Sequence, residues 1–233
     1  MATPLQQTFE ELFAANRILV GEGVIDGFGH VSVRNPLEPD HYFMTRSNAG
    51  GPFDETGVVE LDAGSGVVHP VDVRPSIERF IHGEIYRVRP DVTAVVHTHA
   101  PALIPFGVSA TPLRPLYHMC GFLAAGVPVF DIRKEHGMTN LLITRAELGH
   151  ALAATLGNSA VVLMRGHGAT VVGGSLKEAV FRAVYTTVNA QLQPIAMSLG
   201  EPTYLAPEEA RLADELHHAV LHRPWEYWMN KYA

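Results

Sequence analysis

Apolar residues recur every three or four positions in several stretches of the chain, which is the spacing of one face of a helix. Residues 5–21 show this pattern, and Gly21 ends it. Residues 76–89 show it again, and Pro90 stops that helix. The sequence also predicts helices over 145–156, 175–199 and 207–222, with a short aromatic end around Trp225 and Trp228.

Short runs of β-branched or alternating apolar residues lie between the helices and predict strands. They occupy residues 30–34, 41–45, 58–61, 92–97, 127–130 and 161–164. Brief connections join the first three, which favours antiparallel neighbours because parallel strands need a long crossover. The expected fold is a three-layer α/β (αβα) arrangement, in which a central, mostly antiparallel sheet is flanked by helices. No repeat or long linker interrupts the chain, so we expect a single domain over residues 1–233.

The composition adds predictions about assembly and partners. Charged residues make up 18% of the chain, against about a quarter in typical soluble domains, and buried contacts between subunits are the simplest source of this shortfall. The net charge of −7 gives no basic footprint for nucleic acid. No apolar run has the length of a membrane span, and the N-terminus has no signal-peptide core, so a cytoplasmic protein without membrane contact is expected.

Thirteen histidines stand against a single cysteine, Cys120, so a metal site in this chain must rely on nitrogen and oxygen ligands. His97-Thr98-His99 ends a predicted strand, on which residues i and i+2 project to the same face. Gly166-His167-Gly168 follows another strand, and its glycines let the backbone turn sharply. Each piece alone is also compatible with hydrogen-bonded turn histidines. Together, three histidines from two strand ends predict a metal site with an open coordination position.

Glu78, in Pro75-Ser76-Ile77-Glu78, lies in the first turn of the helix predicted to lead into the His97 strand. In one interpretation, Ser76 caps this helix and Glu78 interacts with its positive end. In the other, a carboxylate beside a bound metal serves as a general acid/base. The spacing alone does not choose between them.

Several motifs together resemble the class II aldolase/adducin family. They are the run from Pro75 to Glu78, the run from Arg89-Pro90-Asp91 to His97-Thr98-His99, Arg165-Gly166-His167-Gly168, and the early Gly29-His30-Val31-Ser32-Val33-Arg34. The resemblance implies that His97, His99 and His167 bind a divalent metal, zinc foremost, with manganese, magnesium or cobalt as alternatives. It implies that Glu78 is the acid/base. It also implies a homotetramer with active sites between subunits.

The sequence departs from the phosphate-binding residues of the family's sugar-phosphate aldolases. His30 replaces an asparagine, and Ser76-Ile77 replaces a pair of serines. The loop that would complete the pocket contains Arg46, Ser47 and Asn48. Two phosphate donors are lost, whereas His30 and the guanidinium of Arg46 suit a carboxylate. We therefore expect His30, Arg46, Ser47, Asn48 and Ser76 to bind a small carboxylated substrate. The alternative for Arg46 is a solvated arginine at a strand end.

These departures resemble the family's decarboxylase branch, which acts on hydroxylated aromatic carboxylates and on ring-cleavage products of the hydroxy-carboxymuconic semialdehyde type. Decarboxylation and aldol cleavage both break a C–C bond and leave an enolate-like anion, which a metal stabilises as a Lewis acid. The sequence thus predicts a metal-dependent lyase, foremost a decarboxylase of aromatic compound catabolism. An aldolase on a non-phosphorylated or carboxylated substrate is the first alternative. A non-catalytic adducin-like or binding protein is the second.

Several other residues receive no definite function from the sequence. His82 is one helical turn after Glu78 and is interpreted as structural or as supporting the site. Tyr117 and His118 either line a neighbouring site or pack. The aromatic tail around Trp225 and Trp228 either covers an active site or docks on the core.

Overall fold

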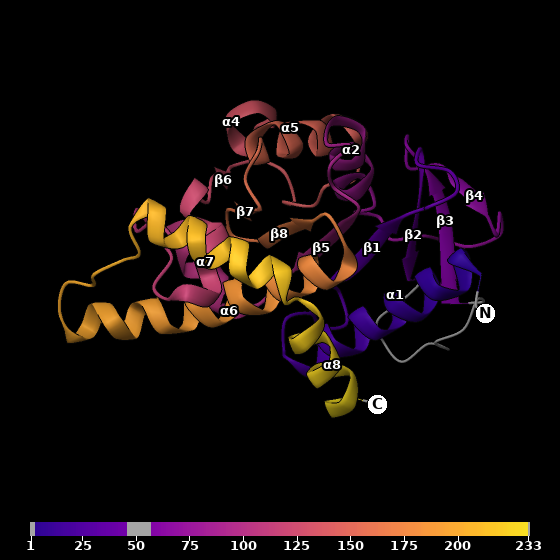
Figure 1. Cartoon of the computed structure of the whole chain (residues 1–233). Coiled ribbons are helices and arrows are strands. Elements are labelled where there is room, and N and C mark those ends of the chain that lie inside the picture. Colours follow the sequence, from indigo (N-terminus) through magenta and orange to yellow (C-terminus); the bar gives the residue numbers. More distant parts are fainter. Residues whose placement is uncertain (1–2, 46–56, 233) are drawn as a thin grey trace.

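The computed structural model describes residues 3–45 and 57–232, and within these ranges eight strands form one sheet (Figure 1). The strand order is β4-β3-β2-β1-β5-β8-β7-β6. The strands are β1 (His30–Arg34), β2 (His41–Thr45), β3 (Val58–Asp62), β4 (Val67–His69), β5 (Ala94–Thr98), β6 (Val129–Phe130), β7 (Val161–Met164) and β8 (Gly168–Gly173). All neighbours are antiparallel except β6 and β7, which are parallel. The predicted mostly antiparallel sheet is confirmed.

Two strands were not predicted from the sequence. β4 is a three-residue edge strand, too short to show a pattern. β8 is central, lies between β5 and β7, and is buried along its whole length. It begins at Gly168 and ends at Gly173, and glycines normally indicate a turn rather than a strand. The sequence therefore predicts only a turn at Gly166-His167-Gly168, where the strand that pairs directly with the His97 strand begins.

All of the predicted helices are present. The α-helices are α1 (Pro4–Gly21), α2 (Phe80–Val88), α3 (Ile104–Val108), α4 (Arg133–His136), α5 (Ala146–Leu156), α6 (Leu176–Leu199), α7 (Pro207–Ala219) and α8 (His222–Lys231). Short 3₁₀ helices cover Pro101–Leu103 and His118–Ala125. Two predicted boundaries are wrong. The helix expected from residue 76 begins at Phe80, after a turn over 77–79, and the helix expected over 207–222 ends at Ala219.

The helices form a layer on each side of the sheet, as the sequence predicted (Figure 1). Successive strand residues point to opposite faces, so Val96 joins the cluster under α1, α6 and α8, whereas Val95 joins the cluster under α2 and α5. His97 follows Val95 at a spacing of two and therefore faces the α2 and α5 layer. Trp225 and Trp228 are buried in the first cluster, so the aromatic tail docks on the core of this chain.

No helix within residues 3–45 and 57–232 is both long enough and apolar enough to cross a membrane.

Candidate metal centre and active site

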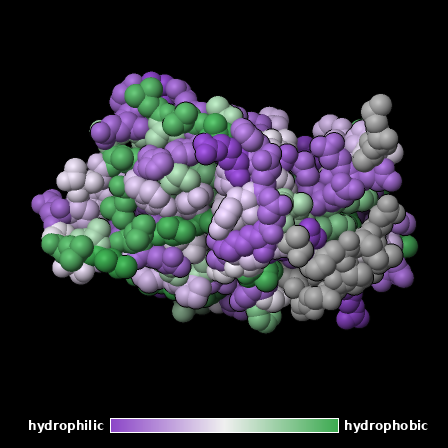
Figure 2. Space-filling view, turned by 60° about the horizontal axis from the view of Figure 1, so that its bottom comes forward, coloured by the Kyte–Doolittle hydropathy of each residue, from purple (hydrophilic) through white to green (hydrophobic). Residues whose placement is uncertain are grey.

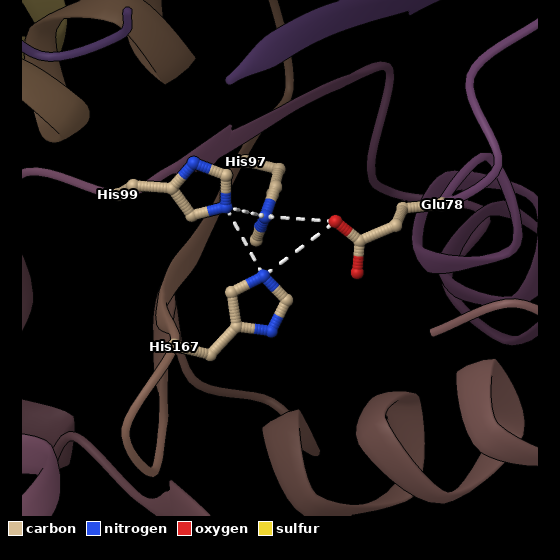
Figure 3. A group of neighbouring side chains, drawn as sticks. All are labelled: Glu78, His97, His99 and His167. Atoms are coloured by element: carbon tan, nitrogen blue, oxygen red, sulfur yellow. Dashed lines mark hydrogen bonds and ion pairs between the residues drawn. The ribbon is translucent and has the colours of Figure 1, made fainter. Parts of the chain in front are cut away.

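Three histidines converge at the ends of neighbouring central strands (Figure 3). His97 lies in β5, His99 follows that strand, and His167 lies in the turn between β7 and β8. The Nε2 atom of His99 is 3.0 Å from Nε2 of His97 and 3.1 Å from Nε2 of His167. The structure therefore brings His97 and His99 together with His167, as the sequence predicted.

Antiparallel pairing of β5 with β8 creates this convergence. Thr98 is opposite Ala169, so the end of β5 lies beside the beginning of β8. Gly166 has a φ of 66°, a conformation that glycine adopts without strain. A Cβ atom on Gly168 would collide with the carbonyl oxygen of Thr98. Glycine at these two positions therefore permits the tight turn that brings His167 against His99.

Glu78 lies in the turn directly before α2, not in the first helical turn as the sequence predicted. Its Oε2 atom is 3.7 Å from Nε2 of His97 and 3.5 Å from Nε2 of His167, and the four ligand atoms of the cluster lie within 4.8 Å of one another. Its Oε1 atom accepts a hydrogen bond from the Ile143 N–H at 2.9 Å. The Ser76 hydroxyl accepts a hydrogen bond from the Glu78 N–H at 3.2 Å. Ser76 thus stabilises the turn that holds Glu78.

The ionisation of these groups suits cation binding. Burial alone would raise the pKa of Glu78, but the proximity of His167, the hydrogen bond from the Ile143 N–H and the proximity of His30 together outweigh burial and lower it. Burial lowers the pKa of His97 well below the ordinary histidine value, with further lowering from nearby histidines. Burial and His167 likewise lower the pKa of His99. An anionic carboxylate therefore lies beside His97 and His99, whose lowered pKa values favour the neutral form with a lone pair for a cation.

The donor set fits a divalent metal. His167 donates from Nδ1 to the carbonyl oxygen of Leu141 at 3.1 Å, which leaves the lone pair on Nε2. Metal–imidazole bonds of about 2.0 to 2.1 Å place tetrahedral ligands about 3.3 Å apart, close to the observed Nε2 separations. His99 has Asp26 near its other nitrogen, with Nδ1 and Oδ1 3.8 Å apart. Within the described residues, Nδ1 of His97 has no hydrogen-bond partner.

His30 is the predicted substrate residue that lies beside this cluster. It is opposite His97 in the pairing of β1 with β5, and the two ring centroids are 5.0 Å apart. Burial lowers the pKa of His30 to about 4, so the ring is neutral near pH 7. Its Nε2 atom is buried and has no hydrogen-bond partner among the described residues. Arg46, Ser47 and Asn48 lie outside the described residues.

Sequence reasoning missed several groups around the site. Asp26 near His99 and the backbone groups of Leu141 and Ile143 lie in irregular segments, and no local pattern indicates them. His82 bonds to His30 and Ser32 through its two ring nitrogens. The spacing of His82 from Glu78 suggested that these two residues are in contact. Spacing along a helix does not show which residues of the neighbouring strand β1 lie opposite His82.

The fold is shared with solved aldolase structures. L-fuculose 1-phosphate aldolase from Glaciozyma antarctica PI12 aligns with a TM-score of 0.77 and 20% identity, over 99% of this chain and 91% of that chain. At this identity the likeness concerns the fold alone.

The sequence comparison gives the family. The family model described as Class II Aldolase and Adducin N-terminal domain matches residues 10–193, and the chain belongs to this family. Decarboxylase tropJ from Talaromyces stipitatus is 40% identical and covers 92% of this chain and 90% of its own length. A 3,4-dihydroxyphthalate decarboxylase from Terrabacter sp. is 29% identical and covers 87% of each chain. The resemblance inferred from the motifs is confirmed.

Proposed function

We propose that this protein is a metal-dependent lyase that removes CO₂ from a hydroxylated aromatic carboxylate or a related ring-cleavage product. Relatives named as decarboxylases match nearly the whole chain. The single observation that carries the proposal at the site is the convergence of three histidine Nε2 atoms beside the Glu78 carboxylate. The adducin-like, non-catalytic alternative has no support in a site with this donor set.

His97, His99 and His167 would hold the metal, and three imidazole nitrogens favour zinc over magnesium. A divalent cation in this position supplies Lewis-acid stabilisation of the negative charge that develops on a substrate oxygen as the C–C bond breaks. The remaining chemistry belongs to side chains of the chain. Manganese and cobalt are alternatives that metal analysis of the purified protein distinguishes.

Glu78 is proposed as the group that moves the proton. Its Oε1 atom is fixed by the Ile143 N–H, and its Oε2 atom faces the histidine cluster. A carboxylate held in this way can orient a water molecule or carry a proton to the carbon that CO₂ leaves. His30, whose Nε2 atom has no partner among the described residues, would hold a substrate oxygen. Arg46, Ser47, Asn48 and Ser76 remain proposed substrate contacts.

A homotetramer with active sites between subunits, located in the cytoplasm, completes the proposal. Several large apolar side chains of α6 and α7 are exposed, including Ile195 at 57%, Leu199 at 85% and Leu216 at 62%. Hydrophobic surface gathers on the side toward which α6 extends (Figure 2). Contiguous apolar surface of this kind is typical of subunit contacts. Light scattering coupled to size-exclusion chromatography tests the tetramer directly.

The test of the reaction uses zinc-loaded protein and a panel of ortho-hydroxy aromatic acids that includes 3,4-dihydroxyphthalate. We expect release of one CO₂ per substrate consumed. Glu78→Gln should retain zinc and lose about 10²- to 10⁴-fold in rate, the range that general acid/base catalysis contributes. Glu84→Gln is the matched control, because Glu84 is also a buried glutamate but lies within α2, pairs with Arg87 and lies near His150.

Two results would overturn the proposal. Zinc-loaded, folded protein that releases no CO₂ from any member of the panel would exclude this decarboxylase activity. Formation of an aldehyde and a keto acid without CO₂ would instead establish the aldolase alternative.

A further inference from the structure

Four side chains from β1 and α2 form a continuous buried chain of hydrogen bonds. The Tyr86 hydroxyl is 2.7 Å from Oγ of Ser32, which is 2.6 Å from Nδ1 of His82. Nε2 of His82 is 2.7 Å from Nδ1 of His30. All four residues are buried, with Ser32 and His82 fully enclosed. We refer to His30, His82, Ser32 and Tyr86 as the histidine relay.

The histidine relay runs from the interior of the molecule to the candidate active site. His30 and Ser32 are alternate residues of β1 and so project to the same face. His82 and Tyr86 are four residues apart on α2, which places them on one face of that helix. The relay ends at Nε2 of His30, which has no hydrogen-bond partner among the described residues. The ring centroids of His30 and His97 are 5.0 Å apart.

Hydrogen atoms can be placed along the histidine relay in only two directions, because each neutral imidazole carries one N–H. The direction is set at Tyr86, whose pKa burial raises, so that the hydroxyl keeps its hydrogen. That hydrogen has two acceptors to choose from: Oγ of Ser32 at 2.7 Å and the carbonyl oxygen of Thr93 at 3.5 Å. Hydroxyl hydrogen bonds normally span about 2.5 to 3.0 Å, so Tyr86 donates to Ser32.

The other positions follow from this choice. Ser32, which accepts from Tyr86, donates its own hydrogen to Nδ1 of His82. His82 then carries its hydrogen on Nε2 and donates to Nδ1 of His30. His30 has its single hydrogen on Nε2, directed away from the relay. The relay thus ends in a buried N–H donor that no described residue satisfies.

We propose that the histidine relay fixes His30 as a neutral Nε2–H donor for an anionic oxygen of the substrate, with His82, Ser32 and Tyr86 as positioning residues. A buried N–H without a partner is unfavourable, which selects for a ligand that supplies an acceptor there. A neutral donor is also suited to its position, because an imidazolium would repel a cation held by the neighbouring histidines. The substrate role rests on the proposed function, whereas the tautomer does not.

The tautomer is measured in zinc-loaded protein labelled with ¹⁵N-histidine, by two-bond ¹H–¹⁵N correlation. We expect a protonated Nε2 and an unprotonated Nδ1 for His30, with the signals assigned through His30→Asn. The opposite assignment would overturn the proposal. Tyr86→Phe removes the hydroxyl that sets the direction, so His30 should then show a mixture of tautomers.

Tyr42→Phe is the matched control. Tyr42 is also buried, and its ring centroid is 5.2 Å from that of Tyr86, but its hydroxyl bonds to Ser65 and to the Arg79 carbonyl oxygen. This variant should leave the His30 tautomer unchanged. If Tyr86→Phe does not fold, Ser32→Ala interrupts the same chain one step later. An unchanged tautomer in every folded relay variant would show that the relay does not set it.

The ligand is tested with 2-hydroxybenzoate and its uncharged amide, 2-hydroxybenzamide. The carboxylate should shift the His30 Nε2–H signal, and the amide should shift it less. Equal shifts would contradict selection of an anionic oxygen. Absence of CO₂ release with the tautomer and the shift intact would contradict the proposed decarboxylation alone, so the two proposals fail separately.

Discussion

Two groups of histidines lie on the same face of the sheet, yet their nitrogen atoms are arranged in opposite ways. In the first group, Nε2 of His99 faces Nε2 of His97 and of His167 at 3.0 and 3.1 Å. In the second, His30 and His82 belong to a chain of hydrogen bonds that continues through Ser32 to Tyr86, and each bond joins one donor to one acceptor. The first group presents lone pairs to one another, whereas the second supplies a hydrogen for each contact.

The difference shows what each group needs in order to be stable. Converging lone pairs are satisfied by a shared cation, whereas a complementary relay is satisfied by its own hydrogens. Exposure agrees with this distinction, because the side chain of His99 is 20% exposed, whereas His82 is fully buried. A metal ion can therefore reach the first group from solvent. Identical residue types thus acquire different chemistry from the atoms that face them.

The largest effect is expected when each group loses one histidine. His97→Asn removes a proposed ligand and should lower zinc affinity by more than about 100-fold, since even partners outside the ligand set contribute about 10- to 100-fold. His82→Asn removes an equally buried histidine and should retain stoichiometric zinc. Metal analysis after desalting measures both. Full zinc in His97→Asn, or loss of zinc in folded His82→Asn, would reverse the assignment of the two groups.

Zinc itself should stabilise only the protein with an intact first group. At a free zinc concentration about 1,000 times Kd, binding to the native state adds about 4 kcal/mol to the free energy of unfolding. We expect a higher thermal midpoint for the wild-type protein and a much smaller increase for His97→Asn. Thermal unfolding with zinc and with a chelator provides the measurement. An equal increase in both proteins would place the stabilising zinc elsewhere.

The first group of histidines could be predicted from the sequence, whereas the second could not. His97, His99 and His167 follow apolar strands in short motifs, so strand periodicity and glycines were enough to suggest their convergence. The relay joins β1 to α2, residues about 50 positions apart, and no local pattern specifies which helix residue meets which strand residue. The same limit explains why β8 was missed, since its place between β5 and β7 depends on long-range pairing that its glycines conceal.

Acidification should destabilise the metal-free protein, because buried histidines of both groups have lowered pKa values, and His30 of the second group should account for part of the effect. Burial lowers the pKa of His30 to about 4 in the folded state, whereas the unfolded value is about 6.5. The unfolded state therefore binds more protons between these pH values, so stability is lost as the pH falls below about 6.5. His30 alone should contribute a loss of about 2 kcal/mol between pH 7 and pH 5.

Urea unfolding at the two pH values measures this loss, with the protein kept free of metal. His30→Asn is the comparison, because asparagine does not titrate in this range. The variant should lose part of the pH dependence. An identical pH dependence of the free energy of unfolding in both proteins would show that His30 does not contribute to it.

The smallest effect is expected from interrupting the relay at its centre. Ser32→Ala leaves Nδ1 of His82 and the Tyr86 hydroxyl without their partner, which should lower the free energy of unfolding by about 1 to 2 kcal/mol. Ser198→Ala is the control, since Ser198 is an exposed serine near the end of α6 and should change stability by less than about 0.5 kcal/mol. Zinc content should be unchanged in both variants. A Ser32→Ala protein that is folded, fully stable and depleted of zinc would mean that the two histidine groups form one site.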